Sequence, residues 1–286
     1  MEARRREEDG GSRAVPTHVH NFSSGWLVPG LAYTMSCIGA LLGLLATSRA
    51  RGVTGYARGR WLTLGAVSIG GTGIWVMHFI AMLGFTISDG EVRYDVGVTL
   101  LSMLIAVLIV GAGLFTIGFG PRTPLVLLIS GTVTGLGVAG MHYTGMAAVH
   151  VGGSILYDRG LVLLSILIAV VACTAALWAA LYVRGRLATL GAALVMGVAV
   201  SGMHYTAMFA VSVVLGADAT LPPGVAAFDF LLPMIIGVGV LTMLVLFIVV
   251  LSPTEHELLD EGRRAAGERR PTGPEPKREW SVFDVQ

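Results

Sequence analysis

Long apolar stretches alternate with short polar connections over most of the chain. An α-helix needs about 20 apolar residues to cross the hydrocarbon core of a bilayer. Seven stretches are long enough, at residues 26–48, 61–85, 96–118, 124–148, 160–182, 187–214 and 228–251. The pattern therefore predicts an all-α membrane protein with seven transmembrane helices. Residues 1–25 are polar and predict an extracytoplasmic tail, and the charged residues 252–286 predict a disordered cytoplasmic tail.

The composition agrees with this setting. The chain is 54% hydrophobic and 13% charged, with a mean hydropathy of +0.76, whereas soluble domains are about 25% charged. A net charge of +1 gives no indication of a nucleic-acid partner. We therefore expect the lipid bilayer to surround a multi-pass protein of the plasma membrane.

Arginines indicate how the helices are oriented. They gather in the connections after the first, third and fifth apolar stretches, as Arg49, Arg51, Arg58, Arg60, Arg122, Arg184 and Arg186. Because short cytoplasmic loops carry an excess of Lys and Arg, these connections are predicted to be cytoplasmic. The N-terminus is then outside and the C-terminus is in the cytoplasm.

A Met-His pair recurs three times, which indicates an internal repeat. The copies read WVMHFIAM at 75–82, GMHYTGM at 140–146 and SGMHYTAM at 201–208. The histidines are 64 and 62 residues apart, the length of two spanning helices with their loops. The segment YDVGVTLLS at 94–102 matches YDRGLVLLS at 157–165, and FSSGW at 22–26 is a degenerate copy. The chain is therefore expected to contain three parallel two-helix repeats, about 22–85, 94–148 and 157–214, followed by helix 228–251.

The repeat predicts that the three histidines lie at one depth. Each is 17 or 18 residues beyond the expected cytoplasmic start of its helix, at Trp61, Pro124 or Leu187. At 1.5 Å per residue this is about 26 Å into a core about 30 Å thick. We expect the three helices to surround a pseudo-threefold axis. Glycines seven residues before each histidine, Gly71, Gly135 and Gly197, would let these helices approach one another closely.

Histidine and methionine at this spacing indicate a metal site. A residue and the residue four positions later share one face of a helix, and each histidine has a methionine at that distance and another just before it. Imidazole and thioether groups suit copper, and the absence of acidic residues from the motifs argues against calcium and magnesium. The predicted ligands are His78, His142, His204, Met77, Met141, Met203, Met82, Met146 and Met208.

Other polar residues are candidates for accessory ligands or for contacts that orient the ligands. They are His18, His20, Asp95, Asp158, Tyr143 and Tyr205. For the two aspartates, helix capping is the alternative, and for the two tyrosines it is anchoring at the membrane interface. The histidines and methionines themselves can also be plain packing groups.

The motif MHYT at 141–144 and 203–206, with MHFI at 77–80, resembles the MHYT-domain integral membrane proteins of bacteria over about residues 20–251. The resemblance implies a membrane sensor that binds copper through Met77, His78, Met141, His142, Met203 and His204. It further implies detection of a diatomic gas such as oxygen, carbon monoxide or nitric oxide. Many relatives continue into cytoplasmic output modules. The 35 residues after position 251 are too few for one, so we expect a separate cytoplasmic signalling partner.

Three other functions remain open at this stage. The chain can be a copper-handling protein for transport or delivery, a single-haem electron carrier, or a structural protein without a ligand. An enzyme is not expected, because the sequence has no nucleotide-binding Gly-rich loop, no nucleophile–base pair and no carboxylate dyad within the apolar stretches.

Overall fold

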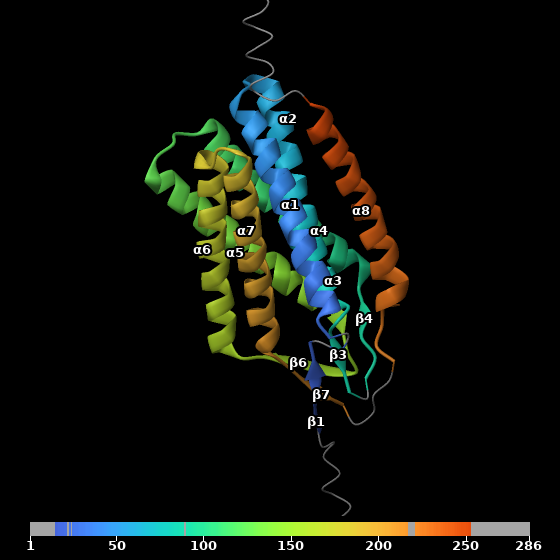
Figure 1. The fold of residues 1–286 in the computed structure, drawn as a ribbon. Coiled ribbons are helices and arrows are strands. Elements are labelled where there is room, and N and C mark those ends of the chain that lie inside the picture. The colour runs from blue at the N-terminus through green and yellow to red at the C-terminus, as the bar shows by residue number, and fades with distance from the viewer. Residues whose placement is uncertain (1–14, 22, 24, 89, 217–220, 253–286) are drawn as a thin grey trace, which may run out of the picture. The chain divides into compact units, whose positions relative to one another are not determined.

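A computed structural model describes residues 15–21, 23, 25–88, 90–216 and 221–252 (Figure 1). Seven helical segments are long and apolar enough to cross a membrane. They are α1 (Leu27–Arg51), Gly55–Met82, α4 (Val96–Phe119), α5 (Pro124–Ala147), α6 (Arg159–Tyr182), α7 (Arg186–Phe209) and α8 (Ala227–Leu251). The predicted seven-helix architecture is confirmed. Residues 1–14 and 253–286 lie outside the described residues, so the expected polar N-terminal and disordered C-terminal tails stay predictions for those ranges.

The second spanning helix is composite and begins earlier than expected. It runs through α2 (Gly55–Ala66), the π-helical segment η2 (Val67–Val76) and α3 (Met77–Met82). The predicted start at Trp61 is wrong. The polar residues 55–60 before it are also helical, so the helix begins before the apolar stretch. Glycine has a poor helix propensity, and η2 contains SIGGTG at 68–73. The π-helical segment ends at Val76, directly before the first Met-His pair.

The connections on the histidine side of the membrane form short antiparallel strands. These are β1 (Val15–Thr17), β2 (Val19–His20), β3 (Thr86–Ile87), β4 (Arg93–Tyr94), β5 (Val149–His150), β6 (Gly153–Tyr157), β7 (Val211–Leu215) and β8 (Val225–Ala226). They make three sheets in the orders β1-β7-β6, β2-β3 and β5-β4-β8. The expectation that the sixth helix extends to residue 214 is wrong, because α7 ends at Phe209 and the valine-rich segment after it pairs as β7.

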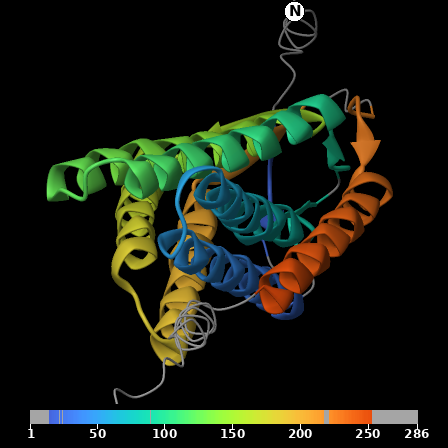
Figure 2. The same cartoon turned by 90° about the horizontal axis from the view of Figure 1, so that it is seen from above.

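Six of the helices close into a bundle. Helix α1 packs on the second spanning helix, which packs on α4; α4 packs on α5, α5 on α6, α6 on α7, and α7 back on α1. Helix α8 lies outside this arrangement beside α1 and the second helix (Figure 2). Val245 and Val249 pack on Leu42, and the hydroxyls of Thr72 and Thr242 are 2.7 Å apart. The second helix is consequently the most buried span, at 89% of its apolar window, against 17 to 44% for the others.

One backbone hydrogen bond recurs in all three repeats and ties the two helices of each repeat together. In each repeat, a backbone N–H just before the first helix donates to a backbone carbonyl that follows the second helix. The acceptor residue comes six positions after the histidine. The pairs are Ser23 with Gly84 at 3.2 Å, Asp95 with Ala148 at 2.8 Å and Asp158 with Ala210 at 2.8 Å. Ser23 thus occupies the place of the two aspartates, and this supports FSSGW as a degenerate copy of the YD segments.

The repeat glycines do not join the histidine-bearing helices to one another, so that expectation is wrong. A Cβ added at Gly135 would lie 2.4 Å from Val170 Cα of α6, and one at Gly197 would lie 2.5 Å from Cys37 Sγ of α1. One at Gly71 would meet only Val107 of α4, at 3.8 Å. Each glycine therefore faces the first helix of another repeat, and at Gly135 and Gly197 the lack of a side chain permits a close approach between repeats.

Three arginines of the predicted cytoplasmic side bind the carbonyl ends of other helices. Their pairs are Arg49 with Val249, Arg51 with Ala180 and Val183, and Arg58 with Gly118. Cationic side chains stabilise helix C-termini by bonding the last carbonyls and by complementing the helix dipole. The end of α1 and the start of α2 thereby contact the ends of α8, α6 and α4.

Candidate metal centre

The three repeat histidines meet inside the bundle. His78 comes from α3, His142 from α5 and His204 from α7, and each is only 1% exposed. Their ring centroids are 4.8 to 5.2 Å apart. The structure thus brings one histidine of each repeat to the same place in the bundle.

The rings contact one another through their Nδ1 atoms. His78 Nδ1 is 3.0 Å from His204 Nδ1 and 3.2 Å from His142 Nδ1. A ring nitrogen offers a single in-plane direction, which carries either one proton or one lone pair. His78 Nδ1 therefore cannot make two good hydrogen bonds at once. A cation among the three nitrogens would satisfy all three lone pairs.

The nitrogen separations fit a first-row metal ion. Metal–nitrogen bonds of about 2.0 to 2.1 Å at tetrahedral angles place ligand nitrogens about 3.3 Å apart. The observed 3.0 and 3.2 Å are close to this value. One ligand nitrogen from each of the three histidines lies within 4.8 Å of the other two. The donor set fits a metal that accepts imidazole.

A small residue three positions after each histidine makes room for the rings. A Cβ on Gly145 would lie 2.6 Å from His78 Nε2 and 3.4 Å from Phe79. The equivalent residues are Ala81, 3% exposed, and Ala207, fully buried. Sequence analysis missed this position, although all three copies of the motif carry a small residue there.

The outer nitrogens of two rings face apolar surroundings. Nε2 of His78 and Nε2 of His142 are buried and have no hydrogen-bond partner among the described residues. A histidine that binds a metal through one ring nitrogen usually donates the N–H of the other nitrogen to an oxygen. His78 and His142 make no such hydrogen bond among the described residues. Phe79 packs edge-on against His78, and Trp75 lies 5.0 Å from Phe79. On its Nε2 side, the His78 ring is therefore held by ring packing, without a hydrogen bond among the described residues.

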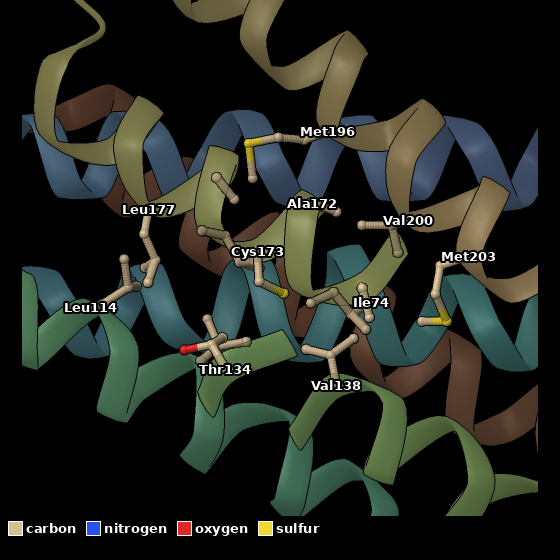
Figure 3. A pocket seen from close by; sticks show the side chains of 14 residues that line it. Ile74, Leu114, Thr134, Val138, Ala172, Cys173, Leu177, Met196, Val200 and Met203 are labelled. Atoms are coloured by element: carbon tan, nitrogen blue, oxygen red, sulfur yellow. The ribbon is translucent and has the colours of Figure 1, made fainter. Parts of the chain in front are cut away.

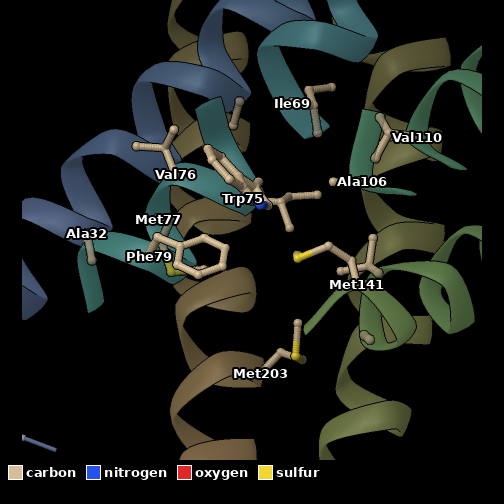
Figure 4. Packing of buried hydrophobic residues seen from close by; sticks show 14 of the residues in the cluster. Ala32, Ile69, Trp75, Val76, Met77, Phe79, Ala106, Val110, Met141 and Met203 are labelled. Carbon is tan, nitrogen blue, oxygen red and sulfur yellow. The ribbon is translucent and has the colours of Figure 1, made fainter. Parts of the chain in front are cut away.

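All six predicted methionines are buried. Met77, Met82, Met141, Met146, Met203 and Met208 are each 1 or 2% exposed. Figure 4 shows Met141 of α5 and Met203 of α7 pointing into the interior between their helices. Thioether sulfur is soft and polarizable, so the buried interior that contains the histidines also contains soft potential donors.

The two predicted tyrosines lie against their neighbouring histidines. Their ring centroids are 5.0 Å from those of His142 and His204. The Tyr143 hydroxyl is 2.8 Å from Ser165 Oγ. This serine closes the YDRGLVLLS segment, and its counterpart Ser102 accepts a hydrogen bond from Trp75 Nε1 at 2.9 Å. The repeat serines therefore bind aromatic side chains near the histidines.

The two predicted aspartates cap helices. Asp95 Oδ1 accepts from the Val98 N–H at 2.8 Å, and Asp158 Oδ1 accepts from the Leu161 N–H at 2.9 Å. Asp95 is the N-cap of α4 and Asp158 is the N-cap of α6, the first helices of their repeats. The capping alternative is confirmed, and the described contacts join neither carboxylate to a histidine.

The other histidines among the described residues, His18, His20 and His150, lie in or next to the short strands. His18 and His20 are exposed, next to or within β2, and His20 pairs with Thr86 of β3. They are not brought together with the three buried histidines in the described structure. His150 lies half-buried in β5 opposite Arg93.

A buried tyrosine of the outer sheets lies near the histidine cluster. The Tyr94 ring is 6.2 Å from that of Phe79, and its hydroxyl has no hydrogen-bond partner among the described residues. Burial raises the pKa of the Tyr94 phenol above its usual value. The phenol therefore stays protonated and adds no negative charge beside the histidines.

Comparison with known proteins gives a family match in the repeat region. A sequence model of the MHYT family, described as "Bacterial signalling protein N terminal repeat", matches residues 71–130 and 135–193. These windows begin at the repeat glycines Gly71 and Gly135 and contain His78 and His142. No solved structure matches the chain.

Curated relatives share the same part of the chain. The bifunctional diguanylate cyclase/cyclic di-GMP phosphodiesterase MucR of Pseudomonas aeruginosa is 42% identical over 191 residues, covering 62% of this chain and 27% of MucR. The cyclic di-GMP phosphodiesterase NbdA of the same organism is 37% identical over 189 residues, covering 63% and 23%. The signaling protein YkoW of Bacillus subtilis is 30% identical over 187 residues, again covering 63% and 23%. The chain spans about a quarter of the length of these relatives.

Proposed function

Because the chain belongs to the MHYT family of bacterial membrane signalling proteins, we propose that it is a sensor whose three histidines hold one copper ion. The chain is a multi-pass protein of the plasma membrane. The observation that carries the proposal is the contact of three Nδ1 atoms at 3.0 and 3.2 Å in an apolar interior. The six buried methionines favour copper over harder metals.

We propose that the site responds to a diatomic gas or to redox state. When bound, copper would supply a redox-active centre that can also take a small ligand. The three histidines belong to three helices, so any change in their separation moves those helices relative to one another. Gly145 and Phe79 pack directly on His78, and a shift of this ring is passed to both neighbours. The sensing domain is proposed to act by repacking, not by catalysis.

The cytoplasmic ends offer a route for the signal. His78 lies near the end of a spanning helix that contains the π-helical segment η2, in which the backbone hydrogen bonds span five residues instead of four. A shift between π and α winding would rotate α2 relative to α3. The end of α1 and the start of α2 carry the arginines that bind the ends of α4, α6 and α8. We propose that a cytoplasmic signalling partner reads this rearrangement, as expected from relatives named for cyclic di-GMP turnover.

Other ligands and functions are less well supported. Two axial histidines of a haem must lie on opposite faces of a flat macrocycle, with the ring between them. The ring centroids here are 4.8 to 5.2 Å apart and the Nδ1 atoms are in contact, which leaves no space for it. A copper transporter needs ligands at successive depths, and the described residues provide one tier of histidines.

A competition titration with a Cu(I) chelator tests the proposal. The wild-type protein, His78→Ala, His142→Ala and His204→Ala are compared with His150→Ala as the control. Each of the first three variants is expected to weaken copper binding by about 100-fold or more, beyond the 10- to 100-fold typical for residues that only orient a ligand. Affinity as high as in His150→Ala would contradict the shared site, and a Soret band in the purified protein would favour haem.

A further inference from the structure

An apolar cavity of about 40 Å³ lies inside the bundle (Figure 3). Its walls come from η2, α4, α5, α6 and α7. The lining residues are Ile69, Ile74, Val110, Leu114, Thr134, Val138, Ala169, Ala172, Cys173, Ala176, Leu177, Met196, Val200 and Met203. By volume, the cavity has room for a few water-sized molecules.

The repeat register places this cavity directly beside the three histidines. Ile74, Val138 and Val200 each precede a histidine by four residues and line the cavity. Residues four apart share a helix face, about 6 Å apart along the axis. Equivalent side chains of all three repeats therefore separate the cavity from the histidines by one helical turn, on the predicted cytoplasmic side. Met203, next to His204, also lines the cavity.

The lining selects against water and ions. It consists almost wholly of aliphatic and sulfur-containing side chains, and cavities of this kind stay dry and bind xenon or apolar ligands. The exception is the Thr134 hydroxyl, which is buried without a hydrogen-bond partner among the described residues. One hydroxyl cannot replace the two to four polar partners that a buried water needs. A small, weakly polar molecule is the occupant that fits.

We propose that the cavity binds one diatomic gas molecule of the class of oxygen, carbon monoxide and nitric oxide, one helical turn from the three histidines. The gas is held by dispersion contacts with the lining. Two heavy atoms allow only weak, millimolar binding, so the cavity is a reservoir and is not selective among these gases. That the reservoir supplies the histidine site rests on the proposed function, whereas the occupancy of the cavity does not.

Xenon is a suitable probe because it binds apolar cavities without any metal. The metal-free protein in detergent is titrated with xenon and followed by 129Xe NMR. Ala172→Leu places a larger side chain in the cavity, where Ala172 points (Figure 3). Ala175→Leu is the matched control, because Ala175 is exposed on the same helix. We expect the saturable xenon shift to be lost in Ala172→Leu and kept in Ala175→Leu.

A second variant covers the case in which Ala172→Leu does not fold. Leu177→Ala removes a lining side chain and enlarges the cavity, so its saturable xenon shift should exceed that of the wild-type protein. Equal shifts in the wild-type protein, Leu177→Ala and Ala175→Leu, or no saturable shift in any of them, would overturn the proposal.

Copper titration of the same samples separates the two proposals. Copper binding without xenon binding would overturn the reservoir and leave the proposed function standing. Xenon binding without copper binding at the histidines would overturn the proposed function and leave the cavity as a gas site. Ala172→Leu is expected to keep the copper affinity of the wild-type protein, because Ala172 lies on α6, which carries none of the three histidines.

Discussion

At the residue scale, the central feature is a set of three imidazoles that share one small space. Three buried histidines are costly in a membrane, and their Nδ1 contacts cannot all be good hydrogen bonds. Sequence period and helix rise predicted that the rings would meet. Which ring nitrogens would meet was not predictable, because it depends on side-chain rotamers and on the packing of Phe79 and Gly145.

Gly145→Ala tests how the rings are held. The added Cβ would lie 2.6 Å from His78 Nε2, so the ring must turn or move away. We expect copper affinity to fall by about 10- to 100-fold, the effect typical of residues that orient a metal ligand. Competition titration against a Cu(I) chelator measures it. Gly140→Ala on the same helix is the control, since a Cβ there meets open space. Equal affinity in the two variants would show that the Gly145 contact does not position His78.

At the element scale, the apolar stretches determined the spanning helices and the motif repeat determined their pairing. The eight strands were not predicted, because segments of two to five residues inside polar connections carry no clear alternation. The π-helical segment was not predicted either, because residues 67–76 form part of one continuous apolar stretch, whose length does not reveal the winding of the helix. We predicted that the glycines seven residues before the histidines would lie at helix contacts, which is correct. The predicted partners were wrong, because these glycines face the first helix of another repeat and not another histidine-bearing helix.

Gly135→Ala tests this contact between repeats. Its Cβ would lie 2.4 Å from Val170 Cα and 2.7 Å from Val170 N, and backbone atoms cannot move aside as a flexible side chain can. Overpacking of this kind costs about 1 to 3 kcal/mol. We expect a lower thermal unfolding midpoint in detergent than for Gly191→Ala, where a Cβ meets nothing within 4 Å. If the two midpoints coincide, α5 and α6 do not depend on this close approach.

At the scale of the whole molecule, the two sides of the membrane differ. The side with the histidines carries the three sheets, and the opposite side carries the arginines that bind helix ends. The positive-inside rule predicts that the arginine side is cytoplasmic. The histidines would then lie towards the outside, and the arginine-bound helix ends would be accessible to a cytoplasmic partner.

Cysteine labelling tests this orientation. In a variant without the native cysteines, Cys37→Ala with Cys173→Ala, Ser154→Cys is expected to react with an impermeant thiol reagent added to intact cells. Thr54→Cys, in the arginine-rich connection, is expected to react only in inverted vesicles. Both positions are exposed. The opposite labelling pattern would reverse the predicted topology.

Copper K-edge X-ray absorption of the Cu(I)-loaded protein tests most directly whether three repeats build one metal site. We predict three imidazole nitrogens at about 2.0 Å from a single copper ion, with thioether sulfur as the remaining type of donor. The imidazole contribution should decrease in each of His78→Ala, His142→Ala and His204→Ala. A spectrum with no imidazole scattering, or one unchanged by these three substitutions, would contradict a shared copper site.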